Sequence, residues 1–128
     1  MAYETNLVTI GTLTAAADLS SKQYHFVSLA SSTTVNVCSA ITNSPIGILQ
    51  NNPEAGEQAI VAVSGISKVV ADGTIAAGNF IGTSADGQAD AIGSGTDTTV
   101  YVMGQGLEAG TAGQTISMLL QVTNCRAA

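Results

Sequence analysis

Short runs of hydrophobic residues alternate with polar residues along this chain, and turn residues such as Asn52-Pro53, Asp72-Gly73 and Asp86-Gly87 interrupt them. Such a rhythm is typical of many short strands in a sandwich or barrel. Helical periodicity is weak, and the best candidate is a single turn over 18–22, with Asp18 capping its start. The expected strands are 7–10, 23–29, 34–38, 46–49, 58–63, 67–71, 79–83, 89–92, 100–104 and 115–122.

The segment 45–70 is the most distinctive part of the pattern and predicts strand, turn, strand, turn, strand. Pro45 has no N–H and can only start an edge strand. Gly47 interrupts a short apolar run, which indicates a bulge or a close approach of two backbones. Ser64-Gly65 is interpreted as a turn between two strands.

Two halves of the chain resemble each other. Phe26-Val27 recurs 54 positions later as Phe80-Ile81, and Ile46-Gly47 recurs 57 positions later as Met103-Gly104. The three-residue difference falls in a loop region, where insertions are tolerated. We therefore expect one β domain over residues 16–122, made of pseudo-repeats at about 16–70 and 71–122, and a tail at 123–128.

The first fifteen residues alternate threonine with aliphatic residues and lie outside the expected repeats. They could form an extra strand of the same barrel or an arm that adds to a neighbour's sheet edge. We favour the arm over residues 1–15, because the repeat is complete without it. The expected fold class is all-β: a small barrel or sandwich built from an internal duplication, with an extended N-terminal arm.

The amino-acid composition limits the partners and functions that can be expected. Charged residues make up only 9% of the chain, far below the quarter of an ordinary domain, which suits surfaces covered by protein partners. The net charge is −6, and only Lys22, Lys68 and Arg126 are basic, so nucleic acid and anionic membranes are not expected partners. Neither a signal peptide nor a membrane span is predicted, and we expect synthesis in the cytoplasm.

No constellation for catalysis, cofactor binding or metal binding is found, so an enzyme is not expected. His25 lies within a predicted strand and is interpreted as a packed or interface histidine. Glu54 and Glu57 flank a turn that we expect to be solvated. Cys38 and Cys125 are expected to be free thiols, with a disulfide formed under oxidising conditions as the alternative.

Three segments carry a resemblance to a known family: residues 16–29 (AADLSSKQYHFVSL), 45–57 (PIGILQNNPEAGE) and 63–70 (VSGISKVV). Together they resemble the small head decoration (capsid cement) proteins of tailed bacteriophages, over residues 15–122. The resemblance implies a mostly β fold, homotrimers at three-fold positions of the head, no catalysis, and binding to the outer surface of the virion by bridging major capsid protein subunits. The arm and the tail depart from the family pattern.

We therefore expect residues 1–15 to contact the capsid or a neighbour, with Tyr3, Leu7 and Ile10 as anchors. Deleting residues 2–12 is expected to abolish binding to expanded heads while the β domain stays folded. The main alternative function is another virion β module, such as a tail- or fibre-associated protein. A carrier domain modified at Lys68 and a cell-surface module are lesser alternatives.

Overall fold

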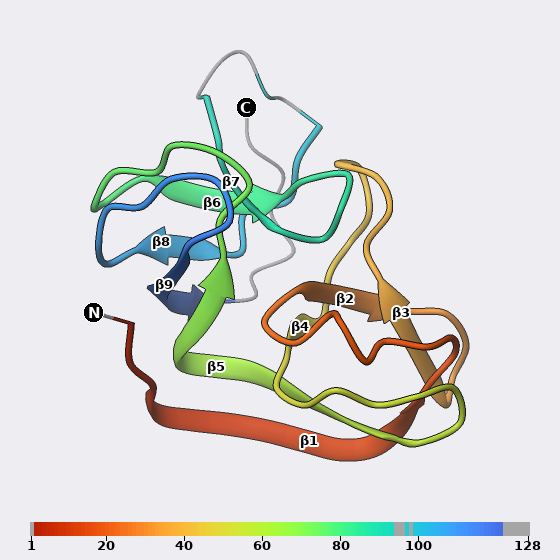
Figure 1. The fold of residues 1–128 in the computed structure, drawn as a ribbon. Coiled ribbons are helices and arrows are strands. Elements are labelled where there is room, and N and C mark those ends of the chain that lie inside the picture. Colours follow the sequence, from red (N-terminus) through yellow and green to blue (C-terminus); the bar gives the residue numbers. More distant parts are fainter. Residues whose placement is uncertain (1, 94–96, 98, 122–128) are drawn as a thin grey trace.

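The structure is a computed structural model that describes residues 2–93, 97 and 99–121, and these residues form nine β-strands and no helix (Figure 1). The expected all-β class with low helix content is confirmed. The strands are β1 (Thr5–Ala15), β2 (Phe26–Leu29), β3 (Thr34–Val37), β4 (Gly47–Leu49), β5 (Gln58–Val70), β6 (Phe80–Thr83), β7 (Ala89–Ala91), β8 (Gly104–Gly106) and β9 (Thr115–Gln121).

All nine strands belong to one sheet with the order β1-β3-β2-β4-β5-β9-β8-β6-β7. An additional pairing of β1 with β5 closes β1, β3, β2, β4 and β5 into a ring. A parallel bridge between Ala71 and Ala89 brings β7 back to the end of β5. The chain is therefore two rolled-up units that share the long strand β5 (Figure 1).

Both halves use the same strand order and the same register. β2 lies between β3 and β4, with β4 beside β5, and β6 lies between β7 and β8, with β8 beside β9. Val27 pairs with Val37 and Gly47. Its counterpart Ile81 pairs with Ala91, 54 positions after Val37, and with Gly104, 57 positions after Gly47. The pairing thus repeats with the offsets that the sequence shows.

Residues 5–15 form the first strand of the first unit and not an arm. Leu13 pairs with Ala59, and Ala15 pairs with Val35 in parallel. The same two pairings recur at the end of β5, where Val69 pairs with Ile116 and Ala71 bridges Ala89. β1 is therefore the counterpart of the second half of β5, so the repeats begin inside these strands and not at residues 16 and 71. The backbone groups of β1 are used within the chain, which favours the extra strand over the arm.

β5 runs through Ser64 and Gly65 as one bent strand, where a turn was expected (Figure 1). Gly65 has a φ of 102°, and a Cβ there would collide with the Asn6 carbonyl oxygen. Asn6, on the facing strand, also has a positive φ of 53°. Glycine is needed here because only it combines this dihedral with so close an approach of β1. The bend lets one strand serve both units.

Each unit has its own apolar core. The core of the first unit consists of Leu13, Ala15, Leu19, Val27, Val35, Leu49, Ala59 and Val61. Its counterparts Val69, Ala71, Ile75, Ile81, Ala89, Ile116 and Met118 lie in the second core, together with further residues of that unit. Phe26, Cys38, Ile48 and Ala62, from the first unit, also belong to this second core. The second unit therefore covers the outer face of the first.

Three further expectations differ from the structure or lie outside it. The strand expected at 100–104 is instead Gly104–Gly106. The expected helical turn at 18–22 is a non-helical turn in which the Asp18 carboxylate accepts a hydrogen bond from the Ser20 amide at 3.0 Å. The Ser20 side chain, and after it this amide hydrogen bond, lowers the pKa of Asp18. The tail at 123–128 lies outside the described residues.

Candidate functional site

The three proposed anchors do not share one exposed surface. Tyr3 is 49% exposed, whereas Leu7 and Ile10 are half-buried and pack against the second and the first core respectively. Val8, which the sequence did not single out, is the exposed apolar side chain of β1, at 54%. Strand alternation is the signal that could have identified it, because Leu7 and Val8 must point to opposite faces.

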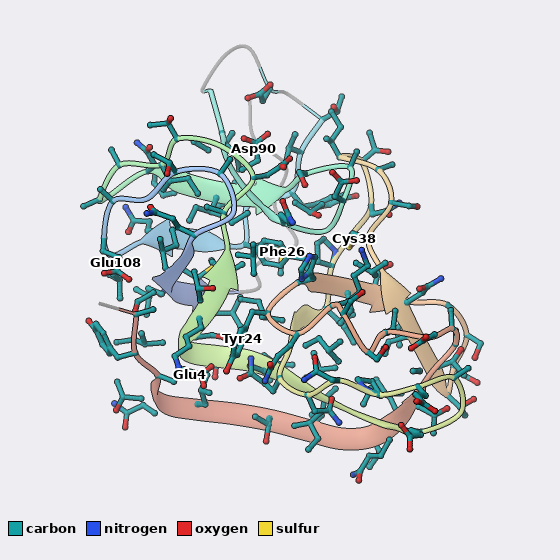
Figure 2. The ribbon with its side chains drawn as sticks, in the orientation of Figure 1. Glu4, Tyr24, Phe26, Cys38, Asp90 and Glu108 are labelled. Carbon is teal, nitrogen blue, oxygen red and sulfur yellow. The ribbon has the colours of Figure 1, made fainter. Side chains whose placement is uncertain are left out.

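The N-terminal residues are held to β5 and β9 by side-chain hydrogen bonds. The Tyr3 amide donates to Ser117 Oγ at 2.7 Å, and this hydroxyl donates to the Tyr3 carbonyl at 3.1 Å. Glu4 Oε2 accepts from the Lys68 amide and from Ser67 Oγ, both at 3.3 Å, and Figure 2 shows Glu4 reaching toward β5. These hydrogen bonds therefore fix the backbone from which the exposed Tyr3 side chain projects.

Large apolar side chains are exposed at several places on the described part of the chain. They are Tyr3, Val8, Leu29, Ile41, Phe80 and Leu107. These residues lie before and on β1, on β2, in the loop after β3, and on the second unit. Scattered exposed apolar residues are normal on a monomer, so exposure alone does not identify a contact surface.

His25 is buried where the two units meet. Its Nδ1 lies 3.1 Å from the Gln23 carbonyl, and its Nε2 lies 3.4 Å from Gln88 Nε2. The neutral ring satisfies both contacts, with Nδ1–H donating to the carbonyl and Nε2 accepting from the amide of Gln88. Burial lowers the pKa of His25 below its ordinary value of 6.5. The position agrees with a packed, interface histidine.

The carboxylates serve local structure. Glu57 Oε1 accepts a hydrogen bond from the Glu54 amide at 2.7 Å and closes an exposed turn. Gln114 does the same to Thr111 in the second unit, at 2.8 Å. Burial, together with the charges of Asp72 and Asp97, raises the pKa of Asp90, which is labelled in Figure 2.

Cys38 follows β3 directly and is a free, buried thiol. Burial raises its pKa to about 11, against smaller opposing effects of hydrogen bonds from Ser28 and Thr83. A thiol with this pKa is almost entirely protonated at neutral pH and therefore unreactive. The expected thiol Cys125 lies outside the described residues.

Other candidate chemistry is sparse. Over residues 2–93, 97 and 99–121, no three His, Cys, Asp or Glu side chains are placed to hold a metal ion. Nor does this part of the chain form a helix long and apolar enough to cross a membrane. Lys68 Nζ lies 5.7 Å from the centre of the Tyr24 ring, a cation–π contact.

Comparison with solved structures gives an informative likeness. No family model and no curated protein sequence matches this chain. Among solved structures, the chain is similar to the head fibre gp8.5 N base of bacteriophage phi29, with a TM-score of 0.65 and 18% sequence identity. The match covers 93% of this chain and 98% of that one. At this identity the likeness shows the fold: both units of this chain adopt an architecture found in a phage head fibre base.

Proposed function

We propose that this chain is a structural protein of a tailed-phage head, bound to the outer surface of the shell. There a homotrimer bridges neighbouring major capsid protein subunits and stabilises the capsid. The observation that carries the proposal is the likeness to a head fibre base, because it extends over almost the whole of both chains. The family resemblance of residues 15–122 points in the same direction.

The surface suits a place outside the shell. Nine acidic residues against three basic ones give a net charge of −6, which opposes contact with packaged DNA. Exposed apolar side chains such as Tyr3 and Val8 provide area for contact with protein. Three moderate contacts held in one trimer bind much more strongly than one, because the second and third form at a high effective concentration.

The capsid contact that we propose lies on the N-terminal segment and β1. The exposed side chains of Tyr3, before β1, and Val8, on β1, contact the shell directly. Leu7 and Ile10 contribute indirectly: they pack on the two cores and hold the strand in place.

Binding to heads tests this proposal. Purified chain is mixed with expanded heads of the phage that encodes it, and the bound fraction is measured by co-sedimentation. A Tyr3→Ser, Val8→Asp double variant is expected to bind at least about tenfold more weakly, equivalent to ~1.4 kcal/mol. Leu107→Asp, an exposed apolar site elsewhere, is the matched control and is expected to bind normally. Failure of the unaltered chain to bind any head would overturn the proposal.

A head fibre base is the second candidate, and the comparison itself favours it. In that function the same fold anchors a longer, protruding polypeptide to the head. Mass spectrometry of virion proteins separates the two candidates. A virion protein near 12.8 kDa supports decoration, and peptides of this chain in a much larger polypeptide support a fibre base.

A further inference from the structure

The two units of the chain meet at a defined, buried junction. The turn between β6 and β7, residues 84–88, lies on the outer face of β2, where the Phe26 amide donates to the Gly87 carbonyl at 2.6 Å. The Thr83 side chain lies close enough to the Cys38 thiol to influence its pKa across the same junction. Figure 2 shows Phe26 and Cys38 between the two units. Phe26 and Thr83 are 0% and 1% exposed, so both sides of the contact are buried.

Residues on both sides of this junction have counterparts in the other unit, and these counterparts are exposed. Phe80 of the second unit corresponds to Phe26, with the same side chain, and is 55% exposed. Leu29 of the first unit corresponds to Thr83 and is 54% exposed. The second unit therefore offers an uncovered receiving face, and the first unit offers a turn at residues 30–34 whose first four residues are exposed.

The sizes of the side chains at these open positions are complementary. Within the chain, a Cβ on Gly87 would lie 2.5 Å from Val37 Cγ2, so this contact requires glycine. The counterpart of Gly87 is Thr33, and the counterpart of Val37 is Ala91, which lacks the methyl groups of valine. Thr33 on the turn is larger than Gly87, and Ala91 on the receiving face is correspondingly smaller than Val37. Gly87 has a φ of 76°, which Thr33 does not share, so the two turns differ in backbone detail.

We propose that the Phe80 face of one copy receives the β2–β3 turn of a second copy of this chain. The contact between copies then repeats the contact between units, with Thr33 against Phe80 and Leu29 against Ile92. The turn 30–34 has the sequence ASSTT and brings no charge into the interface. Such a head-to-tail contact can close into a ring, and a homotrimer would hold six units. The inference rests on the self-association that is part of the proposed function.

Light scattering with substitutions at exposed positions tests the interface. The unaltered chain is expected to have a mass of about three times 12.8 kDa. Phe80→Ser and Leu29→Ser are each expected to lower this mass toward that of one chain, and Leu107→Ser is the matched control that does not. Because Phe80 and Leu29 are exposed within the chain, circular dichroism of both variants should stay native. An unchanged mass in both variants would overturn the proposal.

Cross-linking tests which residues meet. In a Cys125→Ser background, Leu29→Cys chains are mixed with Ile92→Cys chains under oxidising conditions. Disulfide-linked pairs are expected in the mixture and not in either variant alone, because the contact joins two different surfaces. Linkage of Leu29→Cys chains to one another would contradict the proposal.

The two proposals fail separately. A chain that binds heads but stays monomeric at all concentrations overturns this interface and the homotrimer, and leaves only the binding to heads standing. A chain that assembles through Phe80 but ignores heads does the reverse.

Discussion

Gly47 and Gly104 occupy corresponding positions in β4 and β8, and each lies against the backbone carbonyl of the neighbouring strand. A Cβ on Gly47 would collide with the Ala62 oxygen, and one on Gly104 would collide with the Leu119 oxygen. Ala62 and Leu119 are themselves counterparts in β5 and β9. The close approach that Gly47 indicates in the sequence is thus present in both units.

Replacing either glycine should therefore destabilise the fold. Gly47→Ala is expected to lower the free energy of unfolding by about 1–3 kcal/mol, because backbone atoms must move apart. Gly104→Ala should cost more, since Gly104 also has a φ of 150°, which L residues rarely adopt. Urea denaturation measures both. Gly73→Ala is the control, because nothing lies near its Cβ and it should change stability by less than about 0.5 kcal/mol.

Removing residues 2–12 should unfold the first unit and not merely detach an arm. The deletion removes the pairing of β1 with β5 from Thr5 to Ile10 and the packing of Leu7 on the second core. We expect a large fall in melting temperature and loss of amide protection in β5. The single substitution Thr12→Ser, at an exposed position of β1, is expected to leave both unchanged. A truncated chain that melts like the full one would restore the arm interpretation.

Acid should weaken the junction between the units through His25. Burial depresses the pKa of this histidine in the folded chain, so the unfolded chain binds its proton more readily. The neutral side chain is compatible with the fold above the unfolded pKa of 6.5, and stability should fall as the pH drops below that value. In His25→Gln, thermal melts at pH 7 and pH 5.5 should differ less than in the unaltered chain. An equal pH dependence would show that His25 is not responsible.

Cys38 should report on opening of the same junction. Its pKa of about 11 and its burial predict that, in a Cys125→Ser background, a thiol reagent reacts very slowly at pH 7.5. Unfolding in urea should raise the rate to that of a free cysteine. Rapid reaction in native buffer would mean that the second unit does not cover Cys38 stably.

The sequence predicts the repeat but not its boundaries. Matching pairs such as Phe26 with Phe80 and Gly47 with Gly104 are visible because the same residue stands at both positions, and at the two glycines the close backbone approach demands it. The correspondence of Leu13 with Val69 is harder to see, because any aliphatic residue satisfies a core position. Irregular pairing between Ile10 and Leu13 also shifts the alignment by one residue.

The surfaces could be predicted only in part. Strand alternation could have placed Val8 on the exposed face of β1. The exposure of Phe80 could not be inferred from the sequence, because its counterpart Phe26 has the same side chain and is buried. The exposure of the two phenylalanines differs because of the order of the units along the chain. The second unit covers the first, and no further described unit covers the second.

The most direct measurement is a cryo-electron microscopy map of the intact phage particle that encodes this chain. We predict density for the two-unit fold on the outer surface of the head, where three copies meet over a junction of capsid subunits. Density for this fold inside the shell or on the tail, or its absence from the particle, would contradict the account.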